Sequence, residues 1–401
     1  MPYFDNDGIS LYGTNTEMER IKALWLCSWY PDKMQPQNGD FIQRHARATS
    51  LYADITTIHV APCDSAKLGK SKIEIDTETT GNLTENILYY KKHSNRFFHR
   101  FKSVCQYFYH YKKWMDNYLK DYTPDIVHVH IAWRDGITAL WIKKKYNISY
   151  LLTEHWSIYH MDNGALFQKK SFLFKLLVKK IIRNATAVLP VTEHLGRTLG
   201  RLVPSPPFRV IPNVVNTTRF HYIDRPADEG FTFIHVSTMD SNKNTQGIID
   251  AFCQVHKTCP SARLVLIGDI KKITQTKTNN RIAMVNTLTN DEVASYLQGS
   301  DAFVLFSYTE NQPCVILESL CCGVPVIASD VGGVSEIIHK DNGILIEPGN
   351  MEMLVAKMNY MIRHHPQYDR KQISADATIK YAYETVGKQI NAFYRQVLSE
   401  K

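Results

Sequence analysis

The chain has 401 residues, of which 44% are hydrophobic and 21% are charged. This composition is typical of a folded globular protein and excludes a disordered or low-complexity chain. The length exceeds one comfortable core and predicts two domains of about 200 residues each, with a cleft between them. The charge is uneven, because residues 1–200 hold 27 basic and 19 acidic side chains whereas residues 201–401 hold 20 of each. An excess confined to one half predicts an anionic surface or partner for that half alone.

The sequence shows no targeting or membrane-spanning segment. Residues 1–18 are polar and acidic and lack the basic start and apolar middle of a secretory signal. No apolar run reaches the roughly 18 to 20 residues that cross a bilayer, and lysines interrupt the best one, 172–182. The eight cysteines form no CxxC pair and are interpreted as reduced thiols. We therefore expect a cytoplasmic protein.

Apolar, β-branched runs alternate with helix-length amphipathic stretches along the chain, which predicts parallel sheets covered by helices. The expected strands are 21–27, 55–60, 126–129, 150–153, 188–191, 231–237, 263–267, 302–306, 325–328 and 343–346. A proline-rich break at 204–207 divides them into two groups of five. We expect an α/β fold with two Rossmann-like, doubly wound domains, 1–208 and 209–385, and a C-terminal helix, 386–401, that packs back on the first domain.

Ligands of such sheets bind beyond the carboxyl ends of the strands. Polar residues follow several of the expected strands, at 154–155, 237–243 and 307–310. No GxGxxG follows the first strand and no GxxxxGK[ST] occurs, so neither a dinucleotide site nor a P-loop is predicted. The ligand is therefore sought among other classes.

The segment 307–318 contains a loop, a helix start and two glutamates. Pro313 is expected to open the helix, with Glu318 about one and a half turns into it and Glu310 on the loop before it. Both carboxylates can then face one ligand. The free amides of the first turn, near Cys314 and Val315, suit a diphosphate.

This segment, with the Gly323-Val-Pro325-Val326 strand that follows, closely resembles glycosyltransferase family 4. That family consists of retaining enzymes with the GT-B fold, in which two Rossmann-like domains face each other across a cleft. The resemblance spans most of the chain and is densest over 233–348. Shorter matches occur at 39–42, 125–130, 153–155 and 210–213.

The resemblance implies roles for the donor-site residues. Glu318 would bind the ribose hydroxyls of a nucleotide sugar, Glu310 would contact the transferred sugar, and Lys243 would neutralise the phosphates. The family's usual arginine beside this lysine is replaced by Thr238. A Thr238 hydroxyl or a neighbouring amide would have to compensate for the missing charge.

On the first domain, the resemblance assigns Gly39 to a loop whose bare backbone approaches the phosphates. His155 matches the family histidine near the reacting sugar, and Glu154 beside it is a candidate to orient the ring. His128 and His130 alternate along a strand and either pack under the cleft or contact the acceptor.

No clustered set of His and carboxylate residues suggests a metal, so a metal-independent reaction without a cofactor is expected, with a UDP- or GDP-sugar as donor. The implied activity is transfer to a glycan or polyprenyl-linked acceptor in cell-surface polysaccharide biosynthesis. Two alternatives stay open: a nucleotide-sugar-binding protein without turnover, and a sugar-nucleotide epimerase.

Two basic stretches, 91–120 and 169–183, carry eight and six Lys/Arg residues, and the first also holds many aromatic residues. Such helices suit an anionic membrane surface, with aromatic groups at the acyl boundary and cations on the headgroups. We therefore expect peripheral attachment to the inner face of the cell membrane. The alternative is a solvated basic face with its aromatic residues in the core. Binding to nucleic acid is not expected.

Overall fold

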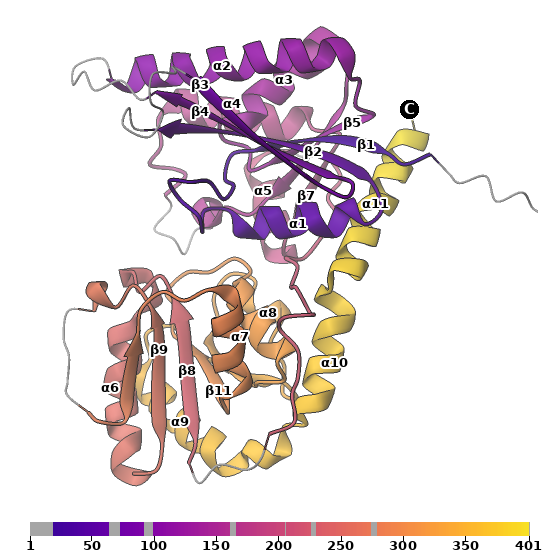
Figure 1. Ribbon diagram of the computed structural model, residues 1–401. Coiled ribbons are helices and arrows are strands. Elements are labelled where there is room, and N and C mark those ends of the chain that lie inside the picture. Colours follow the sequence, from indigo (N-terminus) through magenta and orange to yellow (C-terminus); the bar gives the residue numbers. More distant parts are fainter. Residues whose placement is uncertain are drawn as a thin grey trace, which may run out of the picture.

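The computed structural model describes residues 19–63, 73–91, 99–160, 166–204, 206–225, 230–273 and 279–400. Two α/β domains lie one above the other, each with its own sheet, and the last two helices run along one side of both (Figure 1). Every expected strand is present, and the α/β class with two parallel-sheet, Rossmann-like domains is confirmed.

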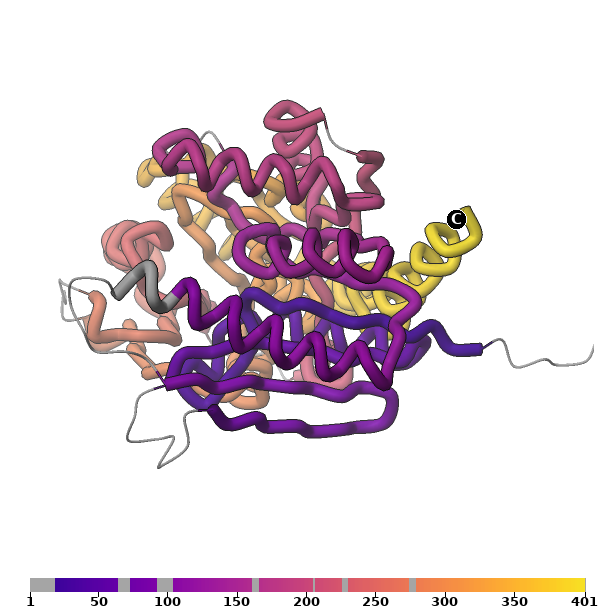
Figure 2. Tube along the Cα trace, turned by 90° about the horizontal axis from the view of Figure 1, so that it is seen from above, coloured from indigo at the N-terminus to yellow at the C-terminus, as the bar shows by residue number. Residues whose placement is uncertain are grey.

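The N-terminal domain is built on a seven-stranded sheet of order β3-β4-β2-β1-β5-β6-β7. Its strands are β1 (Lys22–Cys27), β2 (Asp54–Cys63), β3 (Ile73–Thr80), β4 (Leu83–Lys91), β5 (Ile126–His130), β6 (Tyr150–Glu154) and β7 (Ala187–Pro190). Its helices are α1 (Asp40–Ser50), α2 (His99–Asp121), α3 (Asp135–Tyr146), α4 (Phe172–Asn184) and α5 (Glu193–Leu202). α2, α3 and α4 lie side by side on the part of the domain turned away from the C-terminal domain (Figures 1 and 2).

The hairpin of β3 and β4 was not predicted. β3 runs antiparallel to β4 at the edge of the sheet, and most of its side chains are exposed or half-buried. An edge strand of this kind has no apolar run, so the alternation of apolar segments does not reveal it.

The C-terminal domain has a six-stranded parallel sheet of order β10-β9-β8-β11-β12-β13. Its strands are β8 (Thr232–Ser237), β9 (Arg263–Gly268), β10 (Ile282–Val285), β11 (Ala302–Leu305), β12 (Val326–Ser329) and β13 (Gly343–Ile346). Its helices are α6 (Thr245–Thr258), α7 (Asn290–Gln298), α8 (Cys314–Cys321), α9 (Met351–His364) and α10 (Arg370–Tyr381). α7, α8 and α10 share one hydrophobic core with the sheet, while α6 and α9 share another.

The chain passes between the domains twice. The two crossings meet where the Val215 amide donates to the Tyr381 carbonyl at 2.8 Å. α11 (Tyr383–Ser399) then packs against α1, so closely that a Cβ added to Gly387 would lie 2.0 Å from the Ala48 carbonyl oxygen. Val386, Ile390 and Tyr394 belong to the core of the N-terminal domain. The last helix is therefore structurally part of the first domain, and it starts earlier than the expected residue 386.

Within the described part of the chain, no helix combines the length and apolarity needed to cross a membrane.

Candidate functional site

A cavity of about 550 Å³ lies between the two domains. The N-terminal domain contributes α1 and the loop before it, and the C-terminal domain contributes the ends of β8 and β9 and the start of α8. The predicted residues that line it are Thr238, Lys243, Glu310, Cys314, Val315 and Glu318. The fold thus brings the whole predicted donor set of the second domain to one cavity.

Lys243 and Glu310 are held together by the turn that follows β8. The Asp240 carboxylate accepts from the Asn242 amide at 3.0 Å, and the Asn242 side chain donates to the Thr309 carbonyl at 2.8 Å. These bonds tie the lysine turn to the glutamate loop, and the Lys243 Nζ lies 2.6 Å from the Glu310 Oε1. The pair faces the cavity and leaves about a fifth of the lysine side chain exposed. A lysine that is paired with a carboxylate at the edge of a cavity can exchange this partner for an entering phosphate.

The Glu310 loop depends on two glycines. Gly332 has φ +57°, and a Cβ there would come within 1.9 Å of the Glu310 carbonyl oxygen. A Cβ on Gly333 would meet the Thr192 side chain of the other domain at 2.3 Å. Only glycine fits both positions without displacing the loop.

Asn311 joins the two domains and was not singled out in the sequence. Its Oδ1 accepts the Thr192 hydroxyl at 2.9 Å, and its Nδ2 donates to the His155 carbonyl at 3.1 Å. The neighbour of the sugar-site glutamate thus holds the loop that carries His155. In the sequence, the only indication of this role was that Asn311 directly follows Glu310.

α8 begins at Cys314, with Pro313 at the N-cap and not in the first turn as expected. Cys314 and Val315 line the cavity, and the first amides of a helix have no partner within the helix. Glu318 is 6% exposed and forms an ion pair with Arg44 of α1. No sequence pattern had singled out Arg44.

Gly39 shapes the N-terminal edge of the site. It has φ +68°, and a Cβ would lie 2.5 Å from the Trp29 carbonyl carbon, so this position requires glycine. It caps α1, whose residues Asp40 and Arg44 line the cavity. Its approach to a phosphate stays a prediction.

His155 lies just after β6, 9% exposed, and does not line the interdomain cavity. The centroid of its ring lies 4.7 Å from the ring centroid of Phe41 and 5.5 Å from that of His45. Burial lowers the pKa of His155 well below its usual value, so the ring is neutral. Its contact with the reacting sugar stays a prediction.

The expectation that Glu154 orients the His155 ring was wrong. Its buried carboxylate accepts the Ala132, His155 and Trp156 amides, each at 3.0 Å, and the Tyr159 hydroxyl. The Glu154 carboxylate is thus bonded to the backbone amides of the loop and not to the His155 ring.

His128 packs under the cleft. Its Nδ1 lies 2.6 Å from the Tyr394 hydroxyl and its Nε2 lies 2.7 Å from the Thr153 hydroxyl, and burial lowers its pKa to about 3. His130 is also fully buried, against Trp25. Of the two alternatives, packing is the one that the structure supports.

Thr238 does not replace the missing arginine through its side chain. Its hydroxyl donates to Asp240 at 2.6 Å, and its carbonyl accepts from the Lys272 ammonium at 3.1 Å. Besides Lys243, two basic residues that were not predicted, Lys272 and Arg44, line the cavity.

A second cavity, of about 430 Å³, lies wholly in the N-terminal domain. Three half-buried tryptophans, Trp29, Trp133 and Trp156, line it together with Asp32 and Arg134. Trp29 packs edge-on against Phe41 of α1, at 6.3 Å between ring centroids. Aromatic faces with charged groups at their edges suit a sugar or another amphipathic molecule.

Comparison with known families decides what this site belongs to. Residues 218–384 match the family of "Glycosyl transferases group 1", and residues 77–219 match "Glycosyltransferase Family 4". The chain is a family 4 glycosyltransferase. It is thus an enzyme of the retaining GT-B class that transfers a sugar from a nucleotide sugar.

Among its relatives, this glycosyltransferase is 27% identical over 396 residues to TuaC of Bacillus subtilis, described as a teichuronic acid biosynthesis glycosyltransferase; the match covers 93% of this chain and 95% of TuaC. It is 23% identical to the alpha-monoglucosyldiacylglycerol synthase of Streptococcus pneumoniae, over 69% of this chain and 67% of that protein.

Solved structures share its fold. The sucrose-phosphate synthase of Thermosynechococcus elongatus superposes with a TM-score of 0.76 at 17% identity, covering 95% of this chain and all of that one. Anabaena HepE, solved with UDP, superposes with a TM-score of 0.70 at 16% identity, over 94% of this chain and all of HepE.

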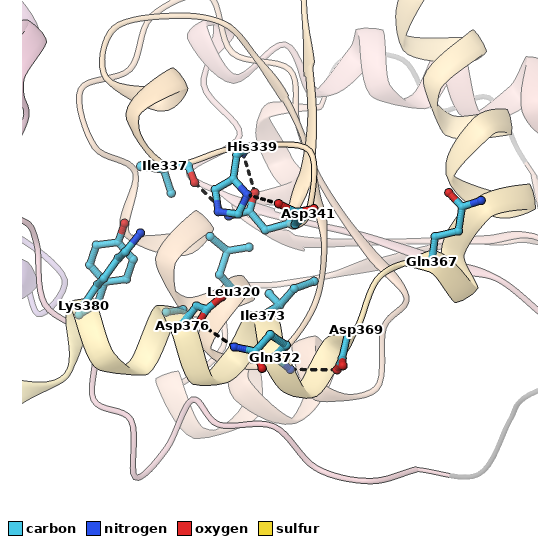
Figure 3. A pocket seen from close by; sticks show the side chains of 13 residues that line it. Leu320, Ile337, His339, Asp341, Gln367, Asp369, Gln372, Ile373, Asp376 and Lys380 are labelled. Carbon is cyan, nitrogen blue, oxygen red and sulfur yellow. Dashed lines mark hydrogen bonds and ion pairs between the residues drawn. The ribbon is translucent and has the colours of Figure 1, made fainter.

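A third cavity of the glycosyltransferase, about 280 Å³, lies on the C-terminal domain between α10 and the segment before β13 (Figure 3). Some of its polar side chains contact one another: Gln372 donates a hydrogen bond to Asp376, and the His339 ring lies 3.6 Å from the Asp341 carboxylate. Among the residues that the structure describes, no three His, Cys, Asp or Glu side chains are grouped to hold a metal ion.

Proposed function

We propose that this glycosyltransferase acts in cell-surface polysaccharide biosynthesis, moving a sugar from a UDP- or GDP-sugar to a glycan or polyprenyl-linked glycan. For the nucleotide-sugar donor, the observation that carries the proposal is the interdomain cavity, which Lys243, Glu310 and Glu318 line together with the start of α8. The similarity to TuaC over nearly the whole of both chains supports the polysaccharide class.

Each donor-site residue has a task that its chemistry suits. Glu318 accepts hydrogen bonds from the ribose hydroxyls, and Glu310 accepts them from the sugar. Lys243 leaves Glu310 for the departing diphosphate, where a fixed cation lowers the barrier by several kcal/mol. The first amides of α8 supply further donors to the same phosphates.

The tryptophan-lined cavity of the N-terminal domain is proposed to hold the acceptor. Tryptophan faces pack on the apolar faces of sugar rings, while Asp32 and Arg134 can bond hydroxyl or acidic groups at the ring edges. Trp29 and Phe41 connect this cavity to the loop and helix that border the donor cavity. An acceptor bound there would lie beside the loop and helix that border the donor cavity.

The two basic stretches expected at a membrane differ in the structure. Among the described side chains of α2, Tyr107 and Tyr111 are buried in the core, as in the alternative of a solvated basic face, whereas Tyr109 and Val104 are 61% and 50% exposed. On α4, however, Phe172, Leu173 and Leu176 are 77%, 62% and 52% exposed. These three residues and the basic side chains Lys169, Lys170, Lys175 and Lys179 form what we call the α4 surface.

We propose that the α4 surface binds an anionic lipid bilayer. Its apolar side chains can enter the acyl boundary while the lysines contact headgroups. The surface lies next to the acceptor cavity, because Phe174 of α4 packs 4.5 Å from Trp133. A lipid-linked acceptor would therefore reach the cavity without leaving the membrane.

Flotation with vesicles containing phosphatidylglycerol tests the membrane proposal. The wild type is expected to float with the vesicles at low salt, and a Phe172→Ser/Leu173→Ser/Leu176→Ser variant is expected to stay at the bottom. Ile379→Ser is the matched control, since Ile379 is 69% exposed on α10. Wild-type protein that does not float would overturn the proposal.

Incubation with a panel of UDP- and GDP-sugars tests the donor half and separates the alternatives. Slow release of nucleotide, or transfer to an added glycan, supports a transferase. Binding without release indicates a binding protein, and a changed sugar still attached to its nucleotide indicates an epimerase. A thermal-shift measurement with UDP and GDP identifies the base.

A further inference from the structure

Arg44 places a cation from the N-terminal domain inside the donor cavity. It lies one turn into α1 and is 7% exposed. One guanidinium nitrogen donates to the Asp40 carboxylate at 2.6 Å, and another donates to the Glu318 carboxylate of α8. The ion pair with Glu318 therefore joins the two domains across the cavity.

The pair is arranged as a binding site and not as core packing. Burial alone lowers the pKa of the Arg44 guanidinium, but the Glu318 and Asp40 carboxylates outweigh this and raise it, so the group stays charged. An isolated buried ion pair contributes little net stability, because desolvation offsets the attraction. A buried arginine that lines an open cavity of about 550 Å³ gains more from a ligand that brings negative charge.

We propose that Arg44 is a donor-binding residue that exchanges one anion for another. Without nucleotide it holds Glu318. When ribose hydroxyls occupy Glu318, the guanidinium keeps Asp40 and turns its freed N–H groups to the diphosphate. The proposal rests on the proposed assignment of Glu318 to the ribose.

The chemistry of the guanidinium fits this exchange. It has five donors in a planar fork, so it can remain bonded to Asp40 while it binds two phosphate oxygens. Because Arg44 belongs to one domain and Lys243, Glu310 and Glu318 belong to the other, the exchange links nucleotide binding to the contact between domains. Lys243 then shares the diphosphate charge with a second cation.

Lys272 is the competing candidate for the second cation. Its side chain is 48% exposed and already contacts the Asp269 carboxylate and the Thr238 carbonyl. Water and salt screen a charge at that exposure, whereas the Arg44 charge is nearly free of water. Arg44 is therefore expected to contribute more to diphosphate binding than Lys272.

Calorimetric titration with uridine, UMP and UDP tests the proposal, with the guanosine series used instead if thermal shift selects that base. Arg44→Gln is expected to weaken UDP binding on the order of tenfold or more while changing uridine binding little, because the lost contact is to phosphate. Arg44→Lys should recover part of the loss, since it keeps the charge without the fork. Arg47→Gln, an exposed position on the same helix, is the matched control.

The outcomes separate this inference from the function on which it rests. If wild-type protein binds neither nucleotide series, the donor assignment fails. If the wild type binds UDP and Arg44→Gln weakens uridine, UMP and UDP equally, Arg44 only positions Glu318 and the exchange is overturned. Unchanged or tighter UDP binding in Arg44→Gln overturns it as well. Thermal unfolding of each variant confirms that it is folded before titration.

Discussion

The two domains present different chemistry to the cleft between them. The C-terminal edge carries charged, partly accessible groups on loops and one helix start, represented by Lys243, Glu310 and Glu318. The N-terminal domain lines the cavity with Asp40 and Arg44. It holds neutral rings in its core, among them His128, His130 and His155, whose pKa values burial lowers.

This difference indicates how the enzyme divides its tasks. Ionic groups on loops can exchange partners when a ligand enters, as in the Lys243–Glu310 pair. Trp25 and His128 have no such freedom, because both are hydrogen-bonded to the Tyr394 hydroxyl inside the core. Substitutions of the charged residues are therefore expected to change donor binding, whereas substitutions among the buried rings of the N-terminal domain are expected to change its stability.

The largest effect is expected from Lys243→Ala. Loss of the cation that meets the departing diphosphate should lower the rate of transfer about 100-fold. Steady-state assays with the donor identified by thermal shift measure it. Lys340→Ala, an exposed lysine outside the cavity, is the control. Wild-type turnover of Lys243→Ala would remove the lysine from the mechanism.

Glu310→Ala should slow transfer by tenfold or more while leaving the affinity for UDP or GDP alone nearly unchanged. The carboxylate is assigned to the sugar, and its removal frees Lys243 for the phosphates. Comparison of kcat with the calorimetric nucleotide Kd measures both effects. Parallel loss of nucleotide affinity would show that Glu310 supports the loop instead of the sugar.

Acid should weaken the N-terminal domain before the C-terminal domain. Burial depresses the pKa of His45, His128, His130 and His155, so only the unfolded chain takes up their protons as the pH falls below about 6.5. Each such group lowers the free energy of unfolding by about 1.4 kcal/mol per pH unit until its folded pKa is reached, which is about 3 for His128.

Other buried groups also change the stability of each domain with pH. In the C-terminal domain, burial lowers the pKa of His235 to about 4. Burial raises the pKa of Asp135, in the N-terminal domain, to about 6. The stability that its protonated carboxyl group contributes is lost as the pH rises toward 6. On acidification Asp135 therefore partly offsets the stability lost through one histidine. Hydrogen exchange resolved by domain at pH 7, 6 and 5 measures the difference. Equal weakening of both domains would contradict the expectation.

The smallest effect is expected from Tyr394→Phe. The hydroxyl accepts the Trp25 indole N–H at 2.9 Å and bonds the His128 ring, so its removal should cost about 1 to 3 kcal/mol of unfolding free energy. Urea denaturation measures this, with Tyr360→Phe on α9 as the exposed control. A change in kcat without a change in stability would argue against a purely structural role.

Much of the fold followed from the sequence because buried parallel strands read as short apolar runs. The strands that were missed, β3, β4 and β10, include edge strands with exposed side chains, where burial does not select apolar residues. The start of α8 was displaced by one residue, because Pro313 is extended at the N-cap.

Part of the donor site was foreseen because its residues are close in sequence: Glu310, Glu318 and the helix start between them fall within one segment. Lys243, which is 67 residues from Glu310 along the chain, was foreseen only through the resemblance to the family. Arg44 and Asn311 were missed because their partners, Glu318 and Thr192, are distant along the chain. Only the packing of one domain on the other reveals such pairs.

The hydrogen-bonded double crossing at Val215 and Tyr381 has a mechanical consequence. Because the two covalent connections are hydrogen-bonded to each other at one point, we expect the domains to open by rotation about that point and not by sliding apart. Residues close to the crossing, such as Asn213, which donates to the Gln312 carbonyl, would then move less than contacts farther out.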